Sequence, residues 1–427
     1  MIEHVWCPVL AALSQTLEKC EEEESIQLIL RTYLLFTHTC GVTGLATPRD
    51  AFLTSLCKFT PNIANNQLLS PMTRKNVQVI KILFNFAHCL GGLLGSSWYI
   101  LLKNFQMFES IMTRDNFKGE LEEDLKILNA ALNNLFKSTE HLDSESLIIV
   151  LKALCSLSKD AMKNTAPNEM PRLFGAQKLV ETVQINAGRV DLIWSYFSAH
   201  ILLLVDHPEE NVRKFGVESV TSVILAIVRP EYNKFVSEAE QLTSIDSALE
   251  QNVLSVLALM FDSAHKDVKE RVLHSINNLI QKCGQVLSGS WPIILPILAS
   301  CCDETAANMN KTIPDPKLLS VAFKGVQQIG NEFLSSLSTD YLIQYIETVG
   351  AYATQQRATD VNINLVAVGI FMSIADYLAA ERNQTELWIK LFSQLVNTIT
   401  DSRPEVRHAS LRTLTFCMTS CGEKFDI

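Results

Sequence analysis

The chain has 427 residues, 48% of them hydrophobic and only 8% aromatic, and its formal net charge is −10. This length exceeds what one small hydrophobic core organises, yet no strong linker divides the chain into independent globules. The acidic balance, with no long lysine or arginine run, disfavours nucleic acid and polybasic lipid binding. An elongated array, in which each unit buries its surface against its neighbours, fits this combination.

The start of the chain predicts a series of helices. From Trp6, "WCPVLAALSQTL" has apolar residues three and four apart, which is the helical period. The acidic run Glu21–Glu24 is interpreted as a solvated face that also favours the dipole of the following helix. In "ATPRDAF", we expect Thr47 to cap a helix, with Pro48 at its first position and Asp50 completing an acidic variant of the capping box.

Two later phrases, "LLGSSWYILL" and "VLSGSWPIIL", are nearly the same. Gly95 and Gly289 are expected to end the preceding elements in the left-handed conformation that glycine adopts cheaply. Ser97 and Ser290 are expected to cap the helices that follow. Each phrase therefore predicts a helix–helix corner with a buried indole.

The tryptophans recur every 92 to 97 residues, and each is expected in the first turn of a helix: Trp6, Trp98, Trp194, Trp291 and Trp388. This interval suits two units of the roughly 40 to 47 residues typical of HEAT or armadillo repeats. We therefore predict an all-α fold, an α-solenoid of HEAT/armadillo-like helical repeats, in which the tryptophans are structural markers.

A second motif recurs in "DHPEENVRKFG", "DSAHKDVKERV" and "DSRPEVRHAS". Each places an acidic residue and a short polar turn before Val-Arg or Val-Lys. In HEAT repeats the Asp and Arg of such turns typically tie neighbouring units together. Asp206, Arg213, Asp401 and Arg407 are therefore predicted to be structural ladder residues.

We expect one continuous array over residues 1–427. Surface loops rich in proline, asparagine and threonine separate its approximate sub-blocks, 1–60, 72–162, 171–302 and 317–427. Because a solenoid should end in a polar-faced cap, the C-terminal residues predict that the chain is a fragment of a longer protein.

The eleven cysteines mostly lie in apolar helical patterns, which predicts reduced core thiols and a cytosolic protein. The most apolar stretches are shorter than the roughly 20 residues that cross a bilayer, so no membrane-spanning helix is expected.

No arrangement for catalysis, cofactor binding or metal binding is expected. The sequence has no phosphate-binding Gly-rich loop with its lysine, no Gly-x-Ser-x-Gly elbow and no His-Glu-x-x-His pair. His88 and His200 lie in apolar helical stretches, and hydrogen-bonded core histidines are expected there.

Four segments, "GLATPRDAFLTSLCKFT", "HLDSESLIIVLKALCSLSKDAM", "LFGAQKLVETVQINAGRVDLIW" and "DSRPEVRHASLRTL", resemble the Mon-two-like scaffold proteins. These are relatives of the large Arf guanine-nucleotide exchange factors, and the matching part lies downstream of the exchange-domain position. The resemblance makes Arg49, Asp50, Asn186 and Arg189 candidates for partner binding. Capping and inter-repeat ties explain the same four positions equally well.

The resemblance implies a helical scaffold without exchange activity and without a cofactor, cytoplasmic and peripheral at the trans-Golgi network and endosomes. It implies protein partners: Dopey-like proteins, Arf-like small GTPases, a phospholipid flippase, and sorting-nexin and retromer components. One alternative is a transport-receptor-like or phosphatase-scaffold solenoid that binds basic cargo through its acidic balance. Another is an exchange factor acting on an Arf-like GTPase.

Overall fold

The structure is a computed structural model that describes residues 2–422, except 62, 65–66, 69–71, 113–120, 166–168, 230–245, 303–315, 357–360 and 382–383. Helices make up nearly all of this part of the chain. One two-residue antiparallel pair is added by β1 (Ile63–Ala64) and β2 (Gln67–Leu68). The predicted all-α class is confirmed.

The protein consists of two compact units, with the change at His200 and Ile201 inside one helix. The helices of unit 1 are α1 (Ile2–Lys19), α2 (Glu23–Val42), α3 (Ala46–Cys57), α4 (Arg74–Cys89), η1 (Gly91–Leu93), η2 (Gly95–Ser97), α5 (Trp98–Met112), α6 (Glu122–Leu135), η3 (Lys137–His141), α7 (Ser144–Lys163), α8 (Phe174–Ile185), η4 (Ala187–Arg189) and most of α9 (Val190–Val205).

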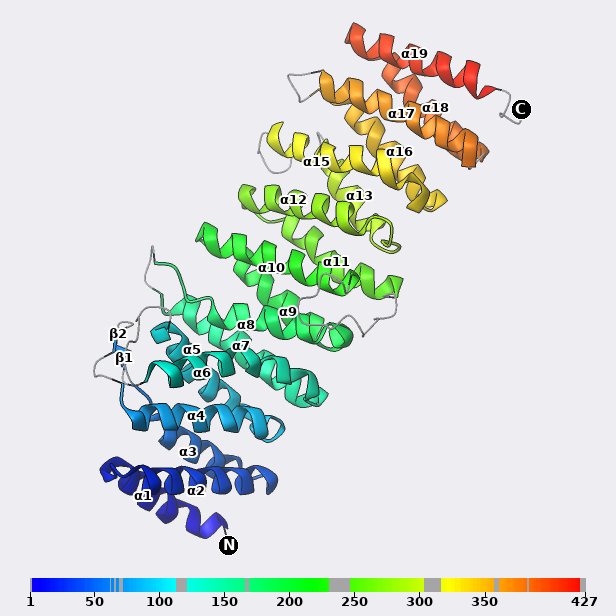
Figure 1. Ribbon diagram of the computed structural model, residues 1–427. Coiled ribbons are helices and arrows are strands. Elements are labelled where there is room, and N and C mark those ends of the chain that lie inside the picture. The colour runs from blue at the N-terminus through cyan, green and yellow to red at the C-terminus, as the bar shows by residue number, and fades with distance from the viewer. Residues whose placement is uncertain are drawn as a thin grey trace. The chain divides into compact units, whose positions relative to one another are not determined.

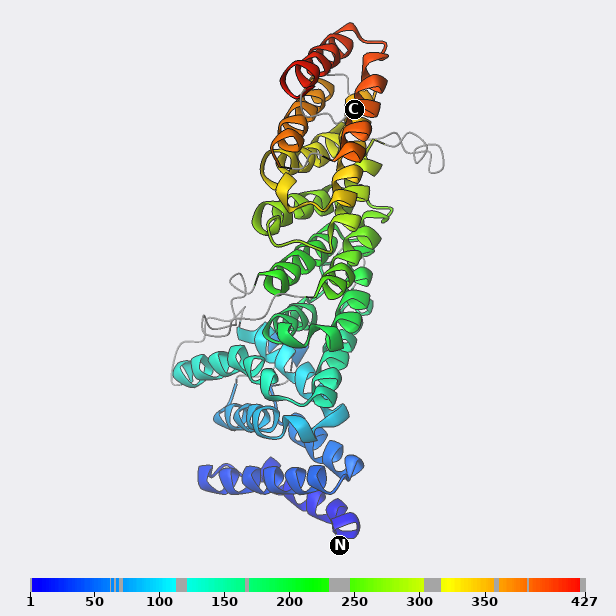
Figure 2. The ribbon, with the colours of Figure 1, turned by 90° about the vertical axis from the view of Figure 1, so that its right-hand side faces the viewer.

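The helices of unit 2 are α10 (Glu210–Val228), α11 (Ser247–Phe261), α12 (Lys266–Cys283), α13 (Trp291–Ser300), α15 (Pro316–Gln328), η6 (Ile329–Phe333), η7 (Leu334–Ser336), α16 (Thr339–Thr354), α17 (Asn362–Glu381), α18 (Thr385–Ile399) and α19 (Pro404–Ser420). Figure 1 labels the helices and Figure 2 shows them from the side.

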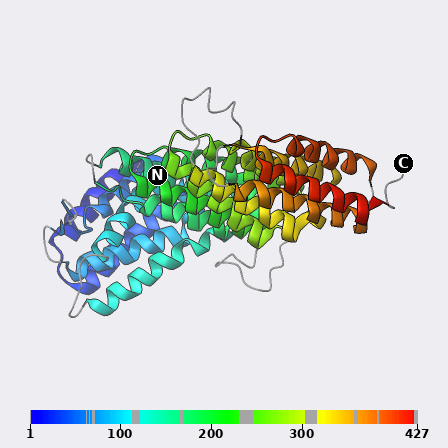
Figure 3. The ribbon, with the colours of Figure 1, turned by 90° about the horizontal axis from the view of Figure 1, so that it is seen from above.

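Within each unit the helices form two layers. In unit 1, α1, α3, α5 and α7 pack in succession, and α2, α4 and α6 pack beside them. In unit 2, one layer contains α11, α13, α16 and α18, and the other contains α10, α12, α15, α17 and α19. Figure 3 shows α17 and α19 side by side. Packing between alternate helices along the chain is the arrangement of HEAT/armadillo-like repeats, so this prediction is confirmed.

The core lies between the layers and is built from one face of each helix. In α12, Val272, Ile276, Leu279 and Cys283 follow the helical period and are fully buried. Hydrogen bonds between neighbouring repeats join residues 40 to 54 positions apart. The separations of 40, 44 and 47 match the repeat length predicted from the tryptophan interval, and the separation of 54 between Thr221 and Ser275 exceeds it.

The cysteines and apolar helices differ in part from expectation. All eleven cysteines are thiols outside any disulfide, but Cys7 and Cys89 are exposed, so core placement is wrong for these two. Residues Ala187–Val205 and helix α17 are long and apolar enough to cross a membrane by length and composition. The absence of a membrane-spanning helix therefore stays a prediction, as does the division into four sub-blocks.

Candidate protein-interaction surface

The first of the two similar phrases forms a corner before α5. Trp98 is the first residue of this helix; its indole is buried and its N–H donates to the Gly91 carbonyl at 2.9 Å. Gly95 has φ +48°, the left-handed conformation expected for it.

An acidic residue from α3 binds the serines of this corner. The Ser97 hydroxyl donates to Asp50, whose carboxylate also pairs with Arg49 at 2.8 Å. Arg49 in turn donates to the Leu93 carbonyl at 3.0 Å. Helix α3 begins at Ala46 without a side-chain cap, so the predicted capping box at Thr47 and Asp50 is wrong.

The second phrase forms the corner before α13. Trp291 is again the first helical residue, and its N–H donates to the Leu287 carbonyl at 3.1 Å. Gly289 does not have a positive φ, so the left-handed prediction is wrong there. Glycine is required for another reason: a Cβ at this position would lie 2.4 Å from the Ser247 carbonyl oxygen.

The serines of this corner bind Glu250 of α11, a buried carboxylate that the sequence analysis missed. Its oxygens accept from the Ser288 N–H at 3.2 Å, the Ser288 hydroxyl at 3.0 Å and the Ser290 hydroxyl. Neither Ser97 nor Ser290 caps its helix as expected. The sequence did contain a signal for these contacts, because an acidic residue lies about one repeat before each Ser-Trp pair.

The remaining tryptophans occupy different positions. Trp194 and Trp388 are buried beside Phe197 and Phe392, with ring centroids 5.4 and 5.8 Å apart. Trp6 is only half-buried. Trp98, Trp291 and Trp388 lie in the first turn of their helices, whereas Trp6 and Trp194 are fifth residues, so the first-turn prediction is wrong for those two.

The first predicted ladder turn joins two repeats of unit 2. Arg213 donates to the carbonyls of His207 and Pro208 at 2.9 and 2.6 Å, which closes its own turn. Its acidic partner is Asp267 of α12, at 3.0 Å. The exposed Asp206 carboxylate lies 3.8 Å from the His265 ring. The cross-repeat ion pair of Arg213 is therefore made with an aspartate that the sequence analysis did not select.

The turn before α19 has the same backbone closure. Arg407 donates to the carbonyls of Asp401 and Ser402 at 2.9 and 2.8 Å. The buried Asp401 carboxylate pairs with Arg403 at 2.8 Å, and the hydrogen bond from Arg403 holds the pKa of Asp401 below its usual range. Arg403 also donates to Asn364 of α17 at 3.1 Å, which extends this turn to the neighbouring repeat.

Asn186 and Arg189 form a similar tie in unit 1. Arg189 donates to the Leu142 carbonyl at 2.6 Å and to the Thr139 carbonyl at 3.0 Å, at the C-terminal end of η3. A cation is favourable at such an end because unpaired carbonyls accumulate there. Asn186 is buried, donates to the Thr139 hydroxyl at 3.0 Å and accepts from Arg189. These contacts explain both positions as inter-repeat ties.

The two histidines differ from expectation. His88 is exposed. His200 is buried, but neither ring nitrogen has a hydrogen-bond partner in the described chain. Burial disfavours the charged ring and lowers the pKa of His200 to about 4, with the Lys159 charge as a smaller cause.

Three open hollows lie along one layer of unit 2; the first presents mainly apolar surface, and the other two present more polar than apolar surface. The first, between α10 and α12, is lined by Glu218, Ser222, Arg271, His274 and Asn278, among others. The second, where α10 and α12 end beside η6, is lined by Arg229, Gln281, Lys282, Gln285 and Glu332, among others. The third, between η6, η7 and α17, is lined by Asn331, Glu332, Ser335, Ser373, Asp376 and Tyr377, among others. We call these three hollows together the unit 2 groove; its cationic side chains lie toward α10 and α12, and Asp376 lies at the α17 side.

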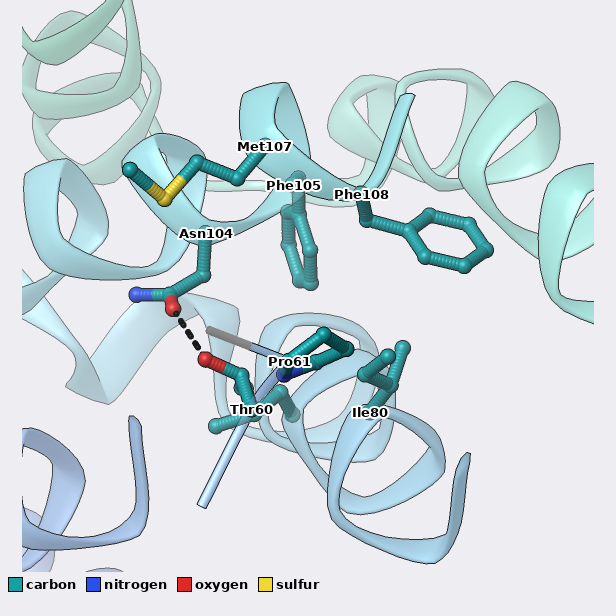
Figure 4. A pocket seen from close by; sticks show the side chains of 8 residues that line it. Thr60, Pro61, Ile80, Asn104, Phe105, Met107 and Phe108 are labelled. Carbon is teal, nitrogen blue, oxygen red and sulfur yellow. Dashed lines mark hydrogen bonds between the residues drawn. The ribbon is translucent and has the colours of Figure 1, made fainter. Parts of the chain in front are cut away.

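A smaller hollow in unit 1 is mainly apolar. Phe105, Phe108 and Ile80 line it, and the Thr60 hydroxyl donates to Asn104 Oδ1 at 3.2 Å beside it (Figure 4). Phe105 stacks on Phe84 with ring centroids 4.4 Å apart. This hollow belongs to the packing between α4 and α5. The unit 2 groove is therefore the better candidate for binding a protein.

Comparisons with known proteins agree with the family resemblance. Residues 234–313 match a family model described as Mon2/Sec7/BIG1-like, HDS. Over 97% of its length the chain is 27% identical to Protein MON2 homolog of Xenopus laevis and 26% identical to that of Homo sapiens. The resemblance to the Mon-two-like proteins is confirmed. The chain is also 22% identical, over its whole length, to Brefeldin A-inhibited guanine nucleotide-exchange protein 1 of Arabidopsis thaliana.

The match covers only part of each relative. The chain spans 29% of both MON2 homologues and 30% of the Arabidopsis protein. Among solved structures, a designed armadillo repeat protein is 14% identical with a TM-score of 0.29, over 61% of this chain and 98% of that one. The karyopherin Kap121p is 14% identical with a TM-score of 0.30, over 98% and 46%. Both scores are low, and the repeat architecture follows from the helix packing above.

Proposed function

We propose that the chain is a non-enzymatic scaffold in membrane trafficking between endosomes and the Golgi. The observation that carries this is the similarity to MON2 homologues along nearly the whole chain. A helical-repeat fold supports the role because it offers an extended surface built from many short units. By resemblance, its partners are Dopey-like proteins, Arf-like small GTPases, a flippase, and sorting-nexin and retromer components, and it acts from the cytoplasm as a peripheral protein at the trans-Golgi network and endosomes.

We assign partner binding to the unit 2 groove. Arg49, Asp50, Asn186 and Arg189 already make inter-repeat hydrogen bonds, which would have to break before these side chains could bind a partner. The groove instead presents polar side chains of several helices in one surface. Its mixed charge suits a partner segment with both acidic and basic residues.

Affinity purification tests this assignment. The chain is used as bait against cytosol and solubilised Golgi membrane, with quantitation of the five partner classes. A double reversal in the groove, Glu332→Lys with Asp376→Lys, should reduce enrichment of the groove partner at least about tenfold. The matched control reverses two exposed charges elsewhere in unit 2, Glu386→Lys with Glu405→Lys, and should leave enrichment unchanged. Equal loss in both variants, or no enrichment by the wild-type chain, would contradict the assignment.

A nucleotide-release assay tests the absence of exchange activity. The chain is added to a panel of Arf-like GTPases loaded with a fluorescent guanine nucleotide. We expect release at the intrinsic rate. Acceleration of about a hundredfold, which corresponds to about 2.7 kcal/mol off the activation free energy, would contradict the scaffold proposal.

A further inference from the structure

Helix α2 has a solvent-facing apolar stripe that no described residue covers. Leu28, Leu35 and Val42 are 68%, 57% and 61% exposed. They are seven residues apart, so they follow one line along the helix over about 21 Å. Single exposed apolar residues are common on protein surfaces, but a regular row along one helix is characteristic of an interaction site.

Two threonines lie between the apolar residues and complete the pattern. With Thr32 and Thr39 included, the spacing along α2 is four, three, four and three, which is the coiled-coil repeat. The hydroxyls of Thr32 and Thr39 donate to the Leu28 and Leu35 carbonyls at 2.9 and 2.7 Å. Because these hydroxyls are paired within α2, the threonines can be covered without leaving an unpaired donor. We call Leu28, Thr32, Leu35, Thr39 and Val42 the α2 seam.

The N-terminal end of the α2 seam is strongly acidic. Glu21, Glu22, Glu23 and Glu24 are all exposed, and none forms an ion pair with another described residue. The Glu22 carboxylate accepts a hydrogen bond from the Ser25 hydroxyl at 2.5 Å. Four uncompensated carboxylates attract a cationic partner and repel an anionic membrane surface.

We propose that the α2 seam binds one amphipathic helix of a protein partner. This helix has an apolar four–three stripe that packs knobs-into-holes against the seam, and basic residues at the end facing Glu21–Glu24. The seam combines leucine with β-branched residues, the combination that favours two-stranded packing. The proposal deepens the scaffold role and rests on it for the biological partner, but the physical site concerns α2 alone.

A second copy of the chain fits the α2 seam less well. In a parallel pair of α2 helices the two acidic ends would meet and repel. In an antiparallel pair each acidic end would face the last turn of the other α2, which contains no lysine or arginine. Neither arrangement compensates Glu21–Glu24, whereas a separate basic helix does.

The test is binding of a synthetic helix to the full chain. The probe is a fluorescein-labelled four-heptad peptide with Leu at positions a and d, Lys at e and g of one terminal heptad, and Gln at the other e and g positions. A peptide of the same composition with the seam positions shuffled is the peptide control. We expect the probe to bind more tightly than the shuffled peptide, and binding to weaken with salt.

Three variants locate the site. Leu35→Asp should weaken probe binding at least about tenfold, because it places a charge where the bound probe would cover an exposed leucine. Replacing Glu22, Glu23 and Glu24 by Gln should weaken binding several-fold and reduce its salt dependence. Leu259→Asp, at a leucine of α11 that is 58% exposed, is the matched control and should bind as the wild-type chain does.

Equal binding of the probe and the shuffled peptide, or unchanged binding by Leu35→Asp, overturns the proposal. So does a wild-type dimer in sedimentation that Leu35→Asp makes monomeric, because the occupant is then a second copy. Circular dichroism and urea unfolding of each variant verify that the chain keeps its total helicity and stability. The peptide assay does not involve the unit 2 groove. A negative result in this assay therefore does not contradict the trafficking proposal, which affinity purification tests separately.

Discussion

The corners before Trp98 and Trp291 have nearly the same local sequence, but each binds its acidic side chain in a different way. In both, an acidic side chain from a preceding helix accepts from the serine before the tryptophan. In unit 1 that acid, Asp50, is paired with Arg49. In unit 2 the acid is Glu250, which is buried and receives its hydrogen bonds from Ser288 and Ser290.

The difference follows burial: the buried Glu250 carboxylate is held by N–H and hydroxyl donors, whereas the half-buried Asp50 carboxylate has both serine donors and an arginine. Hydrogen bonds from N–H and hydroxyl groups favour the charged carboxylate without a positive charge. A cation adds attraction but also has to be removed from water. The two corners therefore provide a matched pair for mutation within one protein.

The largest expected effect is loss of either indole. Trp98→Ala or Trp291→Ala leaves a cavity at a fully packed corner and should lower the free energy of unfolding by about 3 to 5 kcal/mol. Urea unfolding followed by circular dichroism measures it. Trp6→Ala is the control and should cost much less, because Trp6 is only half-buried. An equal cost at all three positions would show that burial at the corners is not the cause.

Lowering the pH should destabilise unit 1 through His200. Its pKa is about 4 in the folded chain, against 6.5 ordinarily, so the unfolded chain binds the proton first as pH falls. Stability is then lost between pH 6.5 and about 4, by up to about 3 kcal/mol. The protection factors of amides in α7 to α9, which correct the measured exchange rates for the slower intrinsic exchange at low pH, should fall across this window, and His200→Leu should remove that fall. The same fall in protection in the Leu variant would assign it to another group.

Glu250→Ala should cost about 2 to 3 kcal/mol, because the Ser288 N–H and two hydroxyls lose a buried acceptor. Glu250→Gln keeps one carbonyl oxygen and should cost less than the alanine variant. Urea unfolding measures both, with the exposed Glu386→Ala as control. If glutamine costs as much as alanine, the charge itself stabilises this corner.

The smallest effect should come from Arg49→Ala, about 1 to 2 kcal/mol, because Asp50 keeps its serine donors and is partly exposed. A double-mutant cycle with Asp50→Ala measures the coupling between the two side chains. A cost above that of Glu250→Ala would reverse the comparison between the corners.

Much of the architecture could be predicted from the sequence because it depends on local periodicity. Apolar residues three and four apart determine which face of each helix is buried, as in α12. The tryptophan interval indicated the repeat length, since each unit must meet its neighbour at the same position. Both signals lie within one repeat or between equivalent positions of successive repeats.

The destinations of the polar side chains could not be predicted in the same way. Ser97 and Ser290 are in the positions of helix caps, yet their hydroxyls donate to acids on other helices. Arg213 was identified as a ladder residue, but its acidic partner is 54 positions away. Local geometry offers each hydroxyl or guanidinium several acceptors, and only the stacking of repeats decides which one is buried beside it.

By itself, the sequence determined an all-α repeat fold, the approximate period of its repeats and the burial of Trp98 and Trp291, because apolar burial follows from spacing along the chain. The tertiary structure alone decided that Glu250 joins a corner, that the buried His200 ring has no hydrogen-bond partner among the described residues, and that three hollows lie along one layer of unit 2. Those features arise where helices from different repeats meet. The physical reason is that desolvation and hydrogen-bond geometry depend on neighbours 40 or more residues away, which no local pattern specifies.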